Sequence, residues 1–151
     1  MRTFRRLVTG HDDQGRAVFV EDAPCPHALP TKGDVITLEL WQHSGPPDNA
    51  QAYEDPIGPV VSIPPPSGGS VFRIVEFPSD PSVVPYLHRT ASLDYCIVLE
   101  GEICAVLDDE ERLLRTGDIV IQRGTNHSWA NRSGRPCLVL FVLIDAPPLG
   151  M

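Results

Sequence analysis

Short runs of β-branched, aromatic and other apolar residues, separated by turn signals, make up most of the chain. Sixteen prolines and twelve glycines leave no helical periodicity longer than about two turns. Short strands with a turn at roughly every ten residues are typical of an all-β sandwich or barrel. The predicted strands cover residues 4–8, 16–20, 35–41, 71–77, 86–90, 94–100, 102–107, 112–115, 118–122, 127–131 and 137–145.

In two of these strands, residues 94–99 and 137–144, the apolar residues do not alternate with polar ones. Such strands are normally covered on both faces. Either the N-terminal strands or a second subunit has to cover the outside of the barrel, and we favour a homodimer.

The distribution of proline and glycine divides the chain into two parts of one structural domain. Residues 1–70 hold N-terminal strands and a long irregular stretch, and residues 71–146 hold the regular strands of the predicted barrel. The stretch 44–70 is rich in proline and glycine and has no repeats. Long loops of this kind are usually functional covers or connectors. It could lie over the barrel mouth or against a partner subunit, and its role stays open.

Composition narrows the classes of partner. Twelve Lys and Arg against twenty Asp and Glu give a formal net charge of −8, with no basic stripe, so we expect no nucleic-acid partner. No apolar run approaches the roughly 20 residues of a membrane helix and no signal peptide is evident, which favours a cytoplasmic protein without a membrane partner. Four cysteines lack any C-x-x-C pair and are interpreted as small core residues.

Two stretches far apart in the sequence carry glycine, histidine and carboxylate residues at characteristic spacings. The first stretch contains His88, Thr90, Asp94 and Gly101, and the second stretch contains Gly117, Asp118, Gly124, His127 and Asn131. In this order the stretches resemble the two motifs of the cupin superfamily, over residues 71–145. The resemblance implies a single-domain cupin: a double-stranded β-helix (jelly-roll) barrel with an N-terminal strand extension and a small-molecule site at its mouth.

The departures from the cupin motifs fall on metal-ligand positions. Metal-binding cupins usually supply three histidines and a glutamate, whereas Thr90 replaces the second histidine here and Asp94 stands for the glutamate. The resemblance implies a divalent transition metal (Fe, Mn, Ni or Zn) held by His88, Asp94 and His127, with open coordination positions. The missing ligand leaves open whether a metal binds at all. Side chains an even number of residues apart on a strand point to the same face of the sheet. This spacing supports a shared inward face for four of the side chains, those of His88, Thr90, Asp94 and Cys96.

Function is therefore expected to centre on His88, Asp94 and His127. We expect an enzyme that acts on a small organic substrate, aromatic or carbonyl-containing, as an oxygenase, isomerase or lyase. A metal-free acid–base dehydratase or cyclase is one alternative, and a non-catalytic sensor of a small ligand is another. Candidate substrate contacts are Thr90, Cys96, Arg123 and Trp129, although core packing for Cys96 and a surface salt bridge for Arg123 are alternatives. His11, His27 and His43 are interpreted as solvated surface residues.

Overall fold

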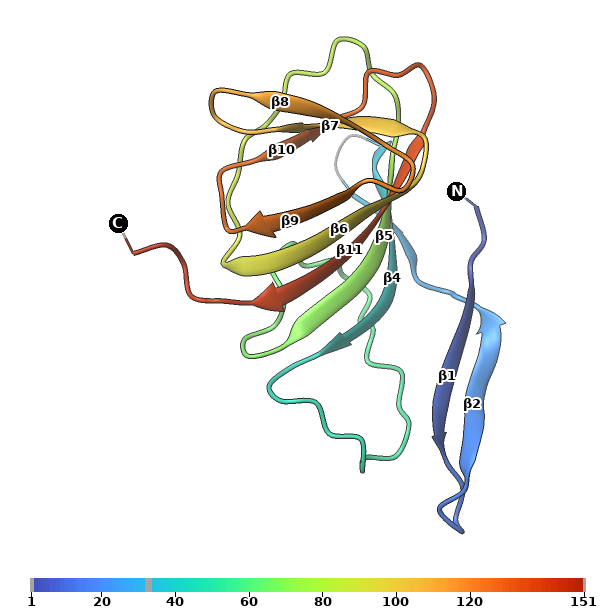
Figure 1. The fold of residues 1–151 in the computed structure, drawn as a ribbon. Helices are drawn as coiled ribbons and strands as arrows, with labels where there is room; N and C mark the ends of the chain where they lie inside the picture. Colours follow the sequence, from blue (N-terminus) through green and yellow to red (C-terminus); the bar gives the residue numbers. More distant parts are fainter. Residues whose placement is uncertain (1, 32–33, 151) are drawn as a thin grey trace.

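The computed structural model describes residues 2–31 and 34–150, and its regular elements are strands (Figure 1). No helix in these ranges is long and apolar enough to cross a membrane. The strands are β1 (Arg5–His11), β2 (Ala17–Pro24), β3 (Ala28–Pro30), β4 (Ile36–His43), β5 (Ser70–Phe77), β6 (Ser92–Glu100), β7 (Glu102–Val106), β8 (Glu111–Arg115), β9 (Ile119–Arg123), β10 (Ser128–Ala130) and β11 (Cys137–Asp145).

Two antiparallel sheets enclose the interior of a barrel. Six strands pair in the order β3-β4-β5-β11-β6-β9, and three pair in the order β10-β7-β8. Figure 1 shows the smaller sheet lying over the larger one, with the β1–β2 hairpin standing beside β4. Consecutive strands repeatedly change sheets, as in a jelly roll. The predicted all-β jelly-roll barrel with an N-terminal strand extension is confirmed.

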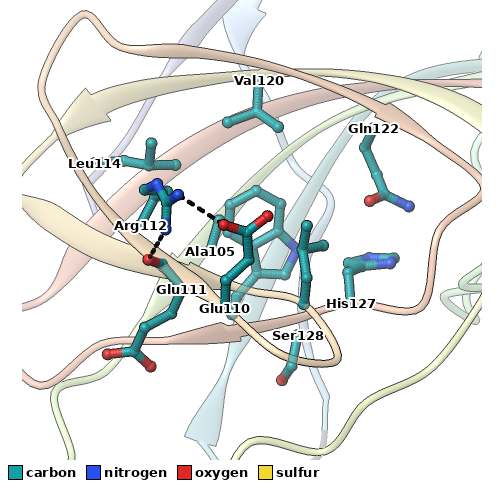
Figure 2. Close-up of a pocket in the computed structure, with 11 residues that line it drawn as sticks. Ala105, Glu110, Glu111, Arg112, Leu114, Val120, Gln122, His127 and Ser128 are labelled. Atoms are coloured by element: carbon teal, nitrogen blue, oxygen red, sulfur yellow. Dashed lines mark hydrogen bonds and ion pairs between the residues drawn. The ribbon is translucent and has the colours of Figure 1, made fainter.

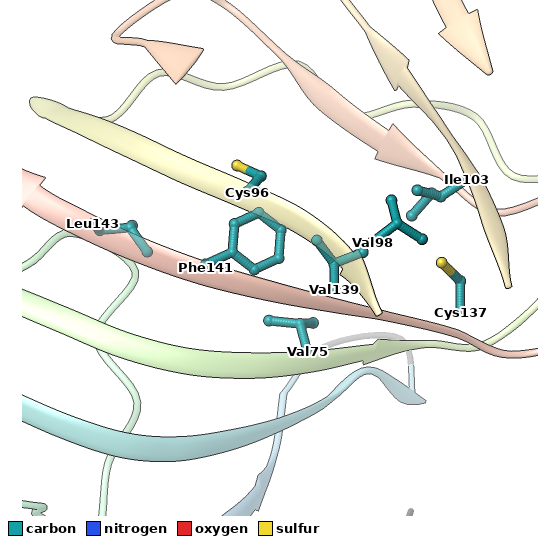
Figure 3. Packing of buried hydrophobic residues seen from close by; sticks show 8 residues of the cluster. All are labelled: Val75, Cys96, Val98, Ile103, Cys137, Val139, Phe141 and Leu143. Carbon is teal, nitrogen blue, oxygen red and sulfur yellow. The ribbon is translucent and has the colours of Figure 1, made fainter. Parts of the chain in front are cut away.

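The barrel interior is filled by the inward-facing side chains of β5, β6, β7 and β11 (Figure 3). Cys96 and Cys137 belong to this cluster, so these two thiols pack as small hydrophobic groups, as predicted. Burial raises the pKa of both thiols, that of Cys137 to about 11, which keeps them protonated. The cluster consists of Val75, Cys96, Val98, Ile103, Cys137, Val139, Phe141 and Leu143.

A second apolar cluster covers part of the outer face of the six-stranded sheet. Leu38, Ile74 and Leu138 point outward and pack against Cys25, with Phe4 next to them. Phe4 precedes β1 and Cys25 follows β2, so the base of the hairpin supplies this cover. The central strand β11 is thus buried on both faces at this end, as its unbroken apolar pattern predicts.

Gly101 makes the sharp turn that carries the chain from β6 in the large sheet to β7 in the small one. Its φ of +84° lies in the left-handed region, and a Cβ there would stand 2.9 Å from the carbonyl oxygen of Pro136. A side chain is excluded both by the backbone conformation and by the neighbouring backbone. The first motif therefore ends on glycine for a steric reason.

The irregular stretch between β4 and β5 is held by a partly buried ionic network around Arg6. Arg6 donates to both carboxylate oxygens of Glu21 (2.7 and 2.8 Å) and to Asp55 (2.5 Å). His27 Nε2 lies 2.8 Å from Asp55, so this histidine is not the solvated surface residue that the sequence suggested. Burial alone would raise the pKa of Asp55, but hydrogen bonds from Arg6 and His27 lower it to about 2. The network fixes the loop to the base of the hairpin.

Candidate functional site

His88 and His127 lie side by side, although 39 positions separate them in the sequence. Each backbone N–H donates to the other residue's carbonyl at 2.9 Å, an isolated bridge that joins the two motifs. The imidazole centroids are 4.5 Å apart with the ring planes tilted by 46°. The predicted strand over residues 86–90 is reduced to this single bridge. The convergence of the two histidines is what the sequence led us to expect.

The imidazole of His127 is held in one tautomer. Its Nδ1 lies 3.0 Å from the carbonyl oxygen of Thr125, and a carbonyl only accepts, so Nδ1 carries the proton. The Nε2 atom is then the unprotonated, basic nitrogen of the neutral ring. Burial lowers the pKa of His127, the Thr125 carbonyl opposes this, and nearby His88 lowers it further. His127 is therefore a neutral base at physiological pH.

A cavity of about 200 Å³ opens beside His127, between the small sheet and β9 (Figure 2). Its polar groups at this end are His127, Gln122 and Ser128. At its rim Arg112 pairs with Glu110 at 2.6 Å and donates to the carbonyl of Glu111 at 2.9 Å. The rest of the lining is largely apolar: Ala105, Leu107, Leu114, Val120 and Trp129.

Trp129 connects this cavity to the hydrophobic core. Its ring meets His127 edge to face at a centroid distance of 6.2 Å and Phe141 at 5.4 Å. Aromatic pairs of this geometry fix ring orientation beyond what burial alone supplies. The predicted substrate contact Trp129 is thus a wall of the cavity and also orients the histidine.

Asp94 lies inside the barrel on β6 and is 3% exposed. Its Oδ1 atom is buried without a hydrogen-bond partner. Burial raises the pKa of Asp94, while a hydrogen bond with Ser92 and the charges of Arg73 and His88 act in the opposite direction. Of the three predicted catalytic side chains, the two histidines are in direct contact, and Asp94 acts on His88 only through its charge.

A second charged pair, which the sequence interpretation did not include, lies next to Asp94 in the barrel interior. Glu39 on β4 and Arg73 on β5 are opposite each other in register, with Arg73 Nε 3.1 Å from Glu39 Oε1. Both are buried, and neither of these atoms has a well-aligned hydrogen bond. We treat the pair as an ion pair by distance, without the added strength of a directed hydrogen bond. The available signal in the sequence was a charged residue between two apolar neighbours on each of the two strands.

The residues present do not fit a resident metal ion. Within residues 2–31 and 34–150, no group of three or more His, Cys, Asp and Glu side chains is arranged to hold one. Thr90, at the position of the second motif histidine, accepts a hydrogen bond from Ser92 at 2.9 Å. Asp94 is directed into the interior among Ser92 and Arg73. The predicted ligand set of His88, Asp94 and His127 is thus not assembled, and no chemical step is derived through a metal.

The remaining predicted substrate contacts divide between interior and surface. Thr90 and Cys96 are buried, and Cys96 belongs to the core cluster. Arg123 is exposed and follows the buried Gln122 on β9, so its side chain points to the opposite face of the sheet. The structure therefore does not bring Arg123 to the cavity, whereas Gln122, which was not predicted, lines it.

Comparison with known proteins places this geometry in a family. The model of the cupin domain matches residues 73–143. Phomopsin biosynthesis cluster protein C' of Diaporthe leptostromiformis is 39% identical over 99% of this chain and 82% of its own length. The cupin-domain-containing oxidoreductase fogC of Aspergillus ruber is 38% identical over 93% of this chain and 71% of its own length.

Solved structures show the same fold at low sequence identity. A Cupin 2 conserved barrel domain protein from Salinispora arenicola matches with a TM-score of 0.52 and 18% identity, over 78% of this chain and 82% of that one. An RmlC-like cupin from Shewanella frigidimarina matches with a TM-score of 0.52 and 13% identity, over 80% of this chain and 84% of that one. With the two motifs, the barrel and these relatives in agreement, the chain belongs to the cupin superfamily.

Proposed function

We propose that this protein is a small-molecule cupin enzyme that transfers protons at carbon and oxygen atoms of a neutral, largely apolar substrate. The observation that carries the proposal is the contact between two imidazoles, one of which lines a cavity with largely apolar walls. Relatives named as cupin-domain-containing oxidoreductases support an enzyme of small-molecule metabolism. Proton transfer of this kind is a step in isomerisation, in dehydration and in the enolisation that precedes an oxidation.

The size and lining of the cavity indicate the class of substrate. A cavity of roughly 150 Å³ with apolar walls holds a benzene molecule, so about 200 Å³ accommodates a single ring with a carbonyl group. The rim carries two carboxylates and one guanidinium, from Glu110, Glu111 and Arg112. This local excess of negative charge disfavours an anionic substrate. We therefore expect a neutral aryl ketone or aldehyde, or a compound of similar shape.

The proposed step is a balanced enolisation. His127 Nε2 takes a proton from the carbon next to the substrate carbonyl, and the C–H electron pair moves to form the enolate. A proton from solvent at the cavity mouth reaches the oxygen and yields the enol, while His88 adjoins His127 without lining the cavity. The reverse sequence returns a proton to carbon, so no oxidant or reductant is consumed. Lack of solvent around His127 keeps its ring neutral and ready to accept a proton.

Hydrogen–deuterium exchange at carbon tests this step directly. Acetophenone, propiophenone and phenylacetaldehyde are incubated with the protein in D₂O, and loss of the α-hydrogen signal is followed by proton NMR. We expect the wild-type protein to accelerate exchange for at least one of them, and His127→Gln to lose at least about 100-fold of that acceleration. His11→Gln, which changes an exposed histidine on β1, is the matched control and should exchange like the wild type.

Two results would contradict the proposal. One is binding of a probe in the cavity, seen as a change in tryptophan fluorescence, without any exchange, which would favour a binding module. The other is exchange that is equally fast in His127→Gln. Failure of every probe to bind would contradict the assignment of the cavity itself.

A further inference from the structure

Removal of a proton beside a carbonyl group leaves negative charge on the substrate oxygen, and that charge needs a hydrogen-bond donor inside the cavity. A hydrogen on such a carbon is far less acidic than an imidazolium, so the neutral His127 alone does not make its removal favourable. Donors that are fixed in advance where an oxyanion develops supply much of the missing stabilisation in enzymes. The lining of the cavity should therefore include such a donor close to His127.

Among the lining side chains that carry an N–H or O–H donor, Gln122 lies at the same end of the cavity as His127 (Figure 2). Arg112 lies at the rim and is already paired with a carboxylate at 2.6 Å. Ser128 stands between two inward-facing residues of the chain, His127 and Trp129, so its hydroxyl points to the opposite face of β10. The indole N–H of Trp129 is an alternative donor, which a separate variant tests.

The carbonyl oxygen of Thr125 holds the amide of Gln122 and the imidazole of His127 together. His127 Nδ1 donates to this oxygen at 3.0 Å, and Gln122 Nε2 donates to it at 3.3 Å. The hydroxyl of Thr125 donates to Gln122 Oε1 at 2.8 Å, which fixes the other end of the amide. A carbonyl only accepts, so the amide nitrogen is the atom that faces it. One turn between β9 and β10 thus positions both the base and the donor.

The amide nitrogen of Gln122 has donor capacity left for a ligand. An amide group carries two N–H donors, and the bond to Thr125 uses one of them. That bond, at 3.3 Å, is longer than the usual range of about 2.7–3.2 Å, so it satisfies its donor only weakly. A buried donor without a good partner costs free energy, which an acceptor on a ligand recovers. The amide therefore favours a substrate oxygen over an apolar group.

Strand register turns this amide into the barrel. Gln122 pairs with Asp94 of β6 and is 5% exposed, whereas its neighbours on β9, Ile121 and Arg123, are exposed on the opposite face. Burying an amide costs free energy that an apolar residue at the same position would not cost. A role in holding a ligand accounts for a glutamine at this inward position.

We propose that Gln122 donates an N–H to the carbonyl oxygen of the substrate and holds the oxyanion that forms when His127 removes the neighbouring proton. The C–H electron pair becomes a carbon–carbon double bond, the carbonyl π pair moves onto oxygen, and a solvent proton then converts the enolate to the enol. This inference rests on the proposed function. It narrows the substrate class to compounds with an acceptor oxygen on the carbon next to the C–H bond that breaks.

Two ligands of the same shape test the hydrogen bond without any reaction. Acetophenone and α-methylstyrene differ only in the carbonyl oxygen, which a CH₂ group replaces in the second compound, and proton NMR titration measures both dissociation constants. The preference for acetophenone, taken as the ratio of these constants, should fall at least about fivefold in Gln122→Met. Differences in hydration between the free compounds cancel in this comparison. Arg123→Gln, at the next position on β9, is the matched control and should keep the wild-type ratio.

Exchange of the α-hydrogen measures the effect on the reacting state. At saturating acetophenone in D₂O, Gln122→Met should exchange about 100-fold more slowly than the wild type. This loss should exceed the change in the dissociation constant, because an oxyanion is a stronger acceptor than a ketone. Gln122→Glu keeps an acceptor for the Thr125 hydroxyl but has no N–H, and should lose exchange to the same extent. Circular dichroism checks folding, and the Nδ1–H signal of His127 checks the turn.

The outcomes separate this inference from the proposed function. A wild-type ratio of dissociation constants in a folded Gln122→Met would overturn the inference, and so would exchange at the wild-type rate in that variant. A ratio that falls only in Trp129→Phe would assign the donor to the indole and overturn it as well. A lower ratio in Gln122→Met without exchange in any protein would support Gln122 as the donor and contradict the enolisation. If neither compound binds the wild type, both proposals fail.

Discussion

Replacing Arg73 by methionine should destabilise the protein strongly, because it removes a buried positive charge that acts on two buried carboxyl groups, Glu39 and Asp94. The guanidinium Nε lies 3.1 Å from Glu39 Oε1, and two unit charges at this distance attract by about 5 kcal/mol at an effective dielectric constant of 20. Arg73 also donates to the carbonyl of Ser62 at 2.7 Å. Breaking a buried pair by removing one partner typically costs about 3–5 kcal/mol, and we expect that loss for Arg73→Met at pH 7.5.

Urea unfolding, followed by tryptophan fluorescence and circular dichroism, measures the loss. The double variant Arg73→Met/Glu39→Leu removes both charges and should recover most of the stability, since buried pairs exchange well for apolar residues. Arg115→Met is the control: its pair with Glu102 is exposed and 3.8 Å long, and should contribute no more than about 1 kcal/mol. The reasoning is refuted if Arg73→Met lies within about 1 kcal/mol of wild type, or if the double variant is as unstable as the single one.

Three further predictions concern the interior carboxyl, the sheet-to-sheet turn and the metal. Burial raises the pKa of Asp94, so the folded state binds the proton of this carboxyl more tightly than the unfolded state does. The folded state therefore loses stability as the pH rises above the ordinary pKa of 3.8. Asp94→Asn should be more stable than wild type at pH 8, and the difference in urea midpoint should close at pH 3.5. An unchanged difference across this range would show that the carboxyl is not desolvated. Gly101→Ala should lower the free energy of unfolding by at least about 1 kcal/mol, because a Cβ would stand 2.9 Å from the carbonyl oxygen of Pro136. An unchanged midpoint of thermal unfolding would contradict the turn geometry. Elemental analysis of protein purified without chelators or a nickel column should find metal well below one ion per chain; a stoichiometric ion lost in His127→Gln would show that the three predicted ligands do converge.

Much of the barrel could be predicted because its signals are local. The unbroken apolar run of β11 indicates a strand covered on both faces, and Gly101 marks the turn between β6 and β7. The segment around His88 was predicted as a strand because its residue types allow one, but it pairs only at the bridge to His127. Residue propensity does not reveal how many backbone groups a segment can pair with.

The charged residues of the interior were harder to assign. The pairing of β4 with β5 shifts between Glu39 and Trp41, so parity counted from Trp41 assigns Glu39 to the wrong face. Arg123 looked suited to bind a substrate, but the register of β9 against β6 turns Gln122 inward instead. Strand register depends on contacts between segments distant in sequence, and the sequence alone did not supply it.

The convergence of the two motif histidines could be predicted, but the geometry that excludes a three-ligand set could not. Thr90 and Asp94 occupy ligand positions of the motif, and only the structure shows that Thr90 accepts from Ser92 while Asp94 is buried and hydrogen-bonded with Ser92. Hydrogen bonds among neighbouring side chains decide which atoms remain available.

The state of the His127 imidazole tests the central claim most directly. Long-range nitrogen–proton NMR spectra of uniformly labelled protein, recorded from pH 8 to pH 4.5, report the tautomer and the pKa of each histidine ring. We expect His127 to be neutral with its proton on Nδ1, to titrate below 6.5, and to show proton–proton contacts with the ring of His88. A His127 that titrates at or above 6.5, or that shows no contact with His88, would contradict a buried pair of imidazoles beside the cavity.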